Sequence, residues 1–188
     1  MADKIFLIAD DDTLTELVQE EYVNEDLLQT LLEKYPDLIP GDQINESDPR
    51  RWLLVSREVP VPGEDGSSRL SLDHLYLDQD AVPTLVEVKR STDSRIRREV
   101  VGQMLDYAAN GVAYWPVETL RAHFIALCER TGKDPDLAVC DLMQADPADG
   151  AEVDRFWTKV KTNLEAGRIR LLFIADVLPP EPGQKSLD

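Results

Sequence analysis

The segment at residues 84–89 constrains the fold of this chain more than any other, because it is a short apolar run that carries two charges. Leucine and valine dominate the run, which is typical of a buried β-strand. Glu87 and Lys89 are two residues apart, so the strand period places both side chains on one face. Charges inside a sheet are costly unless they pair or hold a metal ion. The segment therefore predicts a functional site or, as the alternative, a cross-strand salt bridge on an exposed face.

Two more strand-like segments, residues 52–59 and 71–77, precede this one closely enough to form an antiparallel meander with it. In the second of them Asp73 and His74 are neighbours, so they point to opposite faces, and we expect His74 to be a packing residue. A turn between the strands can bring Asp73 beside Glu87, because adjacent strands lie about 4.8 Å apart. Two such carboxylates would suit a shared Mg²⁺ or Mn²⁺ ion, since these cations prefer hard oxygen ligands.

Helical segments flank the three strands. Asn24 predicts the N-cap of a helix that ends near Tyr35, just before a proline. A second helix is expected at residues 93–109, where Gln103 and Tyr107 are four residues apart and share a face. This helix starts in a basic segment, whose arginines are suited to grip a backbone phosphate.

The order of these segments predicts an α+β fold, an α/β sandwich in which helices flank a mixed β-sheet. The length of 188 residues fits a single domain, residues 1–188. Within it we expect an N-terminal hairpin at residues 1–23, a motif-bearing core at 24–110, a helical insert before the last strand at 112–165, the last strand at 169–177 and a tail at 178–188.

The charge of the chain is unevenly distributed. It has 37 acidic and 20 basic residues, a net charge of −17. Residues 1–48 contain 14 acids and two bases, whereas residues 49–98 contain eight acids and nine bases. A strongly acidic chain is a poor first candidate for nucleic-acid binding, because phosphate contacts need lysine and arginine. Since most of the excess lies before residue 49, the charge does not exclude a nucleic-acid partner, although we expect binding to be weak.

The sequence also bears on the cellular compartment. It contains no run of 18 apolar residues, and it does not begin with a basic segment followed by an apolar stretch. We therefore expect a cytoplasmic protein with no membrane partner. The two cysteines, Cys128 and Cys140, are too few for a disulfide framework and are expected to be reduced and partly buried.

Taken together, Asp73, the Glu87-Val88-Lys89 triplet fourteen residues later and Gln103-x-x-x-Tyr107 resemble the PD-(D/E)XK nuclease superfamily. The likeness is to the subgroup with a Q-x-x-x-Y helix motif, and in particular to the nuclease domain of NucS-type endonucleases. It covers residues 24–110 by motif and the last strand by position only. The resemblance implies a restriction-endonuclease-like core and a Mg²⁺-dependent (or Mn²⁺-dependent) endonuclease that hydrolyses phosphodiester bonds in DNA.

The resemblance also implies a role for each matching residue. Lys89 would position the attacking water or help to deprotonate it, and Gln103 and Tyr107 would orient the lysine, the metal shell or a phosphate. The implied metal ligands are Glu25, Asp73, Glu87 and the Val88 carbonyl. The candidates for contacts with the nucleic-acid backbone are Arg90, Arg95, Arg97 and Arg98.

The sequence departs from the family in ways that leave alternatives open. Leu72 stands where the motif name expects proline, and the separate DNA-binding domain of the NucS type is missing, so a separate DNA-binding partner is one expectation. Related proteins continue after the last strand with another helix, so we expect this chain to be short or truncated. A homodimer is compatible with the sequence. The alternative function is a non-catalytic acidic interaction protein, in which residues 1–48 mimic nucleic acid on a nuclease-like fold.

Overall fold

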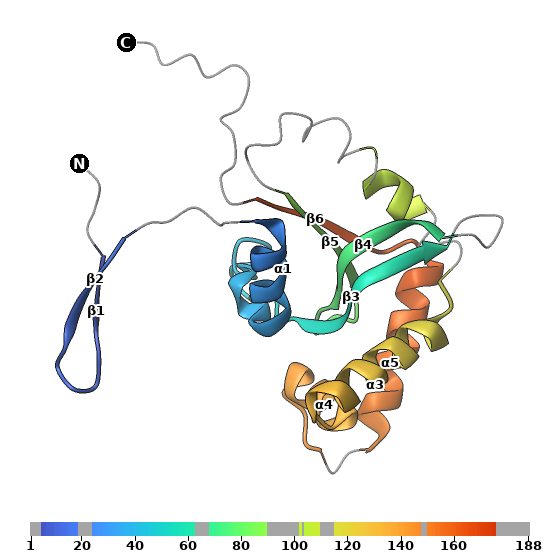
Figure 1. Cartoon of the computed structure of the whole chain (residues 1–188). Coiled ribbons are helices and arrows are strands. Elements are labelled where there is room, and N and C mark those ends of the chain that lie inside the picture. The colour runs from blue at the N-terminus through green and yellow to red at the C-terminus, as the bar shows by residue number, and fades with distance from the viewer. Residues whose placement is uncertain are drawn as a thin grey trace.

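The computed structural model describes residues 5–18, 24–62, 68–89, 102, 104–109, 115–147 and 150–175. The architecture is α+β, as the sequence predicts (Figure 1). A four-stranded mixed sheet carries helices on both faces, and a separate two-stranded hairpin precedes it. No helix in these described segments is long and apolar enough to cross a membrane.

The main sheet has the strand order β3-β4-β5-β6, and the strands span Leu53–Pro62, Ser68–Leu77, Pro83–Lys89 and Arg170–Ala175. The first three form the predicted antiparallel meander, and β6 pairs with β5 in parallel. This order makes β5 an interior strand, which accounts for its nearly continuous burial. Strands β3 and β4 are longer than predicted, because they continue to pair as far as Pro62 and Ser68.

Helix α1 spans Glu25–Lys34 and begins where the sequence predicts. The Asn24 side chain accepts a hydrogen bond of 2.8 Å from the Leu27 amide, which satisfies one of the free N–H groups of the first turn. Leu28 and Leu32 bury the inner face of the helix against one side of the sheet. A short 3₁₀ helix, η1 at Pro36–Leu38, follows it.

The other face of the sheet is covered by the helical insert. Its helices are α3 (Val117–Thr131), α4 (Pro135–Met143) and α5 (Gly150–Glu165). They join the sheet in the larger core cluster, in which Cys128 and Cys140 are free thiols that are more fully buried than predicted. Residues 104–109 are helical, and Met104 and Tyr107 belong to the same cluster, whereas the predicted start of that helix at residue 93 lies outside the described residues.

A buried ion network fixes β6 beside β5. Asp78, which is fully buried, accepts hydrogen bonds from the amides of Asp80 and Val82 and an ion-paired bond of 2.8 Å from Arg170. Arg170 is the first residue of β6, so the turn between β4 and β5 holds the last strand in register. Asn163 of α5 donates to the carbonyl of Ala81 in the same turn, so the insert is tied to this point as well.

The N-terminal hairpin consists of β1 (Ile5–Ile8) and β2 (Leu14–Leu17), which pair antiparallel as predicted. All eight strand residues are exposed, and the apolar side chains of β1 are 47% to 69% exposed. Figure 1 shows the hairpin apart from the sheet and helices. Its strands therefore contribute little to the core that surrounds the candidate site.

Candidate metal centre

The centre of the site is an ion pair at the end of β5. Lys89 Nζ lies 2.9 Å from Glu87 Oε1, and the Glu87 side chain is 2% exposed. The predicted strand period is confirmed, because Val86 and Val88 pack in the cluster under α1 while Glu87 and Lys89 project to the other face. The second carboxylate oxygen of Glu87, Oε2, is buried and has no hydrogen-bond partner among the described residues.

Asp73 joins this pair where β4 and β5 separate. The backbone ladder between the two strands ends at His74 and Val86. Asp73 Oδ2 then accepts a hydrogen bond of 2.7 Å from the Val88 amide, so its carboxylate takes the place of the next backbone partner. Asp73, predicted to come beside Glu87, is thus held at β5 by the backbone of Val88, the residue between Glu87 and Lys89, and its charge acts on Glu87.

Glu25 reaches the same end of the sheet from α1. Its Oε2 atom lies 3.8 Å from Lys89 Nζ. Glu25 is the first residue of α1, so the position of the whole helix decides where this carboxylate lies. Carboxylates from three elements, β4, β5 and α1, therefore act on the charge of the single Lys89 ammonium group.

Burial and mutual repulsion shift the pKa values of the carboxylates. Burial raises the pKa of Glu87, and the charge of Asp73 raises it further, while the hydrogen bond from Lys89 opposes both. Burial likewise raises the pKa of Asp73, against the Val88 amide and the charge of Lys89. Both groups are thus less acidic than ordinary carboxyls, and a nearby cation would favour their charged forms.

Lys89 shows the opposite balance. Burial alone would lower its pKa, but its hydrogen bond to Glu87 and the charges of Glu87, Asp73 and Glu25 outweigh burial and raise the pKa. Lys89 is therefore an ammonium ion at neutral pH. In this arrangement it can donate hydrogen bonds to a water or a phosphate, but it has no lone pair with which to remove a proton.

The side chains of the site fit the implied cation only in part. In the described part of the chain, no group of three or more Asp, Glu, His or Cys side chains converges as a ready metal site. The ammonium of Lys89 is within 4 Å of both Glu87 and Glu25, where a cation would compete with it. The unpartnered Oε2 of Glu87 nevertheless fits a divalent cation, because a buried carboxylate oxygen needs a donor or a metal.

The remaining predicted residues are only partly described. Tyr107 is buried, and its hydroxyl donates a hydrogen bond of 2.7 Å to the carbonyl of Ser71, two residues before Asp73. It thus anchors its helix to β4 near the site. Val88 is placed by its amide, and its carbonyl as a metal ligand stays a prediction. The side chains of Gln103, Arg90, Arg95, Arg97 and Arg98 lie outside the described residues.

Sequence reasoning missed the contacts that hold α1. Arg57 of β3 donates to side chains of α1, namely Asp26, Gln29 and Thr30. His74, expected to pack, is fully buried and contacts the Gln29 carbonyl through Nε2 at 3.0 Å. Burial lowers the pKa of His74 to about 4, so the ring is neutral. Strand alternation places His74 on this face, but no local signal identifies Arg57, whose partners depend on tertiary structure.

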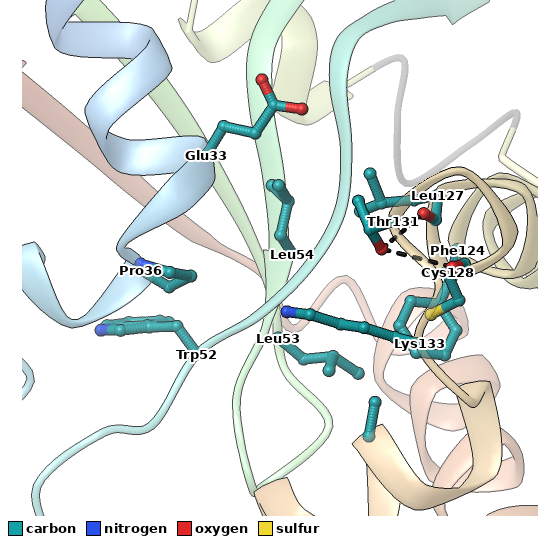
Figure 2. Close-up of a pocket in the computed structure, with 11 residues that line it drawn as sticks. Glu33, Pro36, Trp52, Leu53, Leu54, Phe124, Leu127, Cys128, Thr131 and Lys133 are labelled. Carbon is teal, nitrogen blue, oxygen red and sulfur yellow. Dashed lines mark hydrogen bonds between the residues drawn. The ribbon is translucent and has the colours of Figure 1, made fainter.

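A cavity also lies among α1, β3 and α3. Its volume is about 120 Å³, and its lining is mainly apolar, with side chains such as Trp52, Leu54 and Phe124 (Figure 2). A more open hollow of about 620 Å³ adjoins it and shares Trp52 and Lys133. Their linings include no member of the metal centre, so the carboxylate cluster at the end of β5 is the stronger site.

Comparisons with known proteins add nothing to the geometry of the site. No protein-family model, curated protein or solved structure matches this chain.

Proposed function

We propose that this protein is a Mg²⁺-dependent nuclease that hydrolyses phosphodiester bonds in nucleic acid, as a DNA endonuclease, with Mn²⁺ able to replace Mg²⁺. The observation that carries the proposal is Glu87. Its carboxylate is buried in the sheet, and one of its oxygens has no donor among the described residues. The other oxygen is paired with Lys89, which also lies near Glu25, and Asp73 contacts the backbone between Glu87 and Lys89. A carboxylate in this position has little value for stability, so we infer a chemical role.

Each residue then has a defined task. Asp73, Glu87 and Glu25 would hold the cation together with the Val88 carbonyl. The bound cation would supply a Lewis acid for a phosphoryl oxygen. Lys89, as an ammonium ion, would position the attacking water and offset the negative charge that develops on the phosphate. We therefore favour positioning over deprotonation for Lys89.

The proposed reaction is hydrolysis without a covalent intermediate on the protein. The oxygen of a water forms a bond to phosphorus while the bond from phosphorus to the leaving sugar oxygen breaks. The water releases one proton to solvent and the leaving oxygen takes one up, so the products are a phosphomonoester and a free hydroxyl. Arg90, Arg95, Arg97 and Arg98 are proposed to contact the backbone of the substrate.

Binding of the substrate is expected to be weak. Residues 1–48 contain 14 acids and two bases, and Asp26 directly follows the proposed ligand Glu25, so negative charge near the site repels phosphate. The proposal accordingly includes a separate DNA-binding partner and a cytoplasmic location, with a homodimer as a further option.

The test is nicking of supercoiled plasmid DNA at low salt. The wild-type chain should nick the plasmid with Mg²⁺ or Mn²⁺ and not with a chelator. Lys89→Ala and Asp73→Ala should each lower the rate by at least about 100-fold, as expected when a group that stabilises the transition state is lost. Lys161→Ala serves as the matched control, because Lys161 is an exposed lysine of α5 whose partner, Glu165, lies 4.0 Å away.

Circular dichroism of each variant would establish that the fold is intact. Nicking that persists in folded Lys89→Ala and Asp73→Ala variants, or in the presence of chelator, would overturn the proposal. Equal losses in Lys161→Ala would show that the assay reports surface charge and not the site.

A second function is favoured by one feature, the exposed apolar hairpin with its acidic turn. Residues 5–18 contain four acids and no base. A non-catalytic interaction protein that occupies a partner's basic groove would use this surface. Absence of Mn²⁺ binding by calorimetry, together with specific capture of a basic DNA-binding protein that depends on the hairpin, would favour this function over the nuclease.

A further inference from the structure

We propose that His74 and Tyr76 are positioning residues that set the axial position of α1 and thereby bring Glu25 to the metal centre. The inference rests on the proposed function, since the cation is the same one. It assigns a role to two side chains on the face of the sheet opposite to Asp73 and Glu87.

The contacts that carry the inference run from β4 to carbonyl oxygens of α1. His74 Nε2 lies 3.0 Å from the Gln29 carbonyl oxygen, and the Tyr76 hydroxyl donates a hydrogen bond of 3.0 Å to the Leu32 carbonyl. Both side chains are fully buried, and their rings stack with centroids 5.8 Å apart. The two acceptors are three residues apart, so they lie about one turn apart along the inner face of the helix.

These two hydrogen bonds fix the axial position of α1, which apolar packing alone does not determine. Leu28 and Leu32 hold α1 against the sheet, but apolar contacts have no direction. An α-helix rises about 1.5 Å per residue, so a shift of α1 along its axis by that amount would lengthen and bend both hydrogen bonds at once. The pair of bonds therefore selects one axial position of α1.

Arg57 strengthens the same attachment nearer to Glu25. It pairs across the strands with His74 and donates to Gln29 Oε1 at 3.1 Å and to Thr30 Oγ1 at 3.2 Å. It also forms an ion pair with Asp26, the residue that follows Glu25. Contacts from two strands thus fix the first turns of α1, from which Glu25 reaches to 3.8 Å from Lys89.

The chemical form of His74 agrees with such a role. The neutral ring has one N–H, and the contact with a carbonyl assigns it to Nε2. Nδ1 is then buried and has no hydrogen-bond partner in the described part of the chain. An apolar ring would fill the same space without an unpartnered nitrogen, so the histidine is better explained by its directional bond to α1 than by packing.

The experiment is a double-mutant cycle on Mn²⁺ affinity, measured by calorimetry with the full chain. Glu25→Gln should weaken binding by roughly tenfold, and His74→Phe by a similar factor, as outer contacts of metal ligands do. If His74 acts through Glu25, the double variant should bind no more weakly than Glu25→Gln alone. His74→Gln, which keeps a donor near the position of Nε2, should restore most of the affinity.

Trp52→Phe is the matched control. It removes a buried indole bond to the Ile39 carbonyl in the same core cluster, without a hydrogen bond to α1, and should leave Mn²⁺ affinity unchanged. Tyr76→Phe loses only a hydroxyl, so it provides the same cycle if His74→Phe fails to fold. Its effect should likewise vanish in the Glu25→Gln background.

Two failures can be told apart. If the wild-type chain binds Mn²⁺ but His74→Phe or Tyr76→Phe weakens binding equally with and without Glu25, the positioning role is wrong and the metal centre stands. If the wild-type chain binds no Mn²⁺, the proposed function is wrong and the positioning role falls with it.

Discussion

At the scale of single residues, Glu87 shows how a functional site opposes stability. The carboxylate lies in the interior of a sheet, where burial raises its pKa above the ordinary value. A carboxyl whose folded-state pKa is raised stabilises the fold at low pH, where it is protonated in both states. That contribution is lost as the pH rises through the folded-state pKa, so at neutral pH the ionised group destabilises the protein.

This sign predicts a stabilising substitution. Without metal at pH 7, Glu87→Gln should raise the free energy of unfolding by on the order of 1 kcal/mol, or about 2–4 °C in Tm for a chain of this size. The advantage should be smaller at pH 4 than at pH 7, because the raised pKa favours the protonated form of Glu87 as the pH falls. Thermal unfolding followed by circular dichroism at the two pH values, in a chelating buffer, measures it.

Glu118→Gln is the control for this prediction, because Glu118 is exposed at the start of α3 and its Tm difference should stay small at both pH values. A variant that is less stable than the wild type at pH 7 would mean that the ion pair with Lys89 outweighs burial. Added Mn²⁺ should stabilise the wild type and not Glu87→Gln.

At the scale of elements, local signals in the sequence predicted those features of the structure that depend on residues close together in the chain. The Asn24 cap and the period-two face of β5 both involve residues within four positions of each other, and both predictions are confirmed. The position of Asp73 near β5 also followed, because a short turn joins β4 and β5.

Elements whose partners are distant in the chain could not be derived in the same way. The extension of β3 to Pro62 depends on its pairing with residues 68–70 of β4. The contacts of Arg57 with α1 depend on the packing of a helix on a sheet. The Lys89 ammonium near Glu25 is a further case, because it needs the axial position of α1, which no local pattern encodes.

The N-cap of α1 gives a prediction at this scale. Asn24→Ala should lower the free energy of unfolding by about 1 kcal/mol, because the Leu27 amide loses its acceptor. Asn24→Asp keeps an acceptor and should be close to the wild type. Urea unfolding curves of the three proteins test this, and equal midpoints for Asn24→Ala and the wild type would mean that the cap is not needed.

At the scale of the whole molecule, the hairpin and the sheet-and-helix body differ in how they bury apolar surface. The body has two core clusters, one on each face of the sheet, whereas the strands of the hairpin are exposed throughout. A two-stranded hairpin is at best marginally stable by itself in water. The hairpin is therefore expected to contribute little to the folding of the body.

Deletion of residues 1–18 tests this separation. The Tm of the shortened chain should change by no more than the equivalent of about 0.5 kcal/mol, as for surface changes, and binding of the dye ANS should fall. Leu54→Ala, a truncation inside the core, should by contrast cost about 2–5 kcal/mol. A loss of that size on deletion would mean that the hairpin packs against the body.

The parallel pairing of β5 with β6 has a consequence for the order in which the protein matures. Leu85 pairs with Leu171, and the register continues to Lys89 and Ala175, so the strand that carries Glu87 gains its second neighbour only after the whole insert has been synthesised. Contacts between such distant segments form slowly. A nascent chain that ends before residue 170 has Asp73, Glu87 and Lys89 on an open strand edge, and the site becomes enclosed only as translation passes β6.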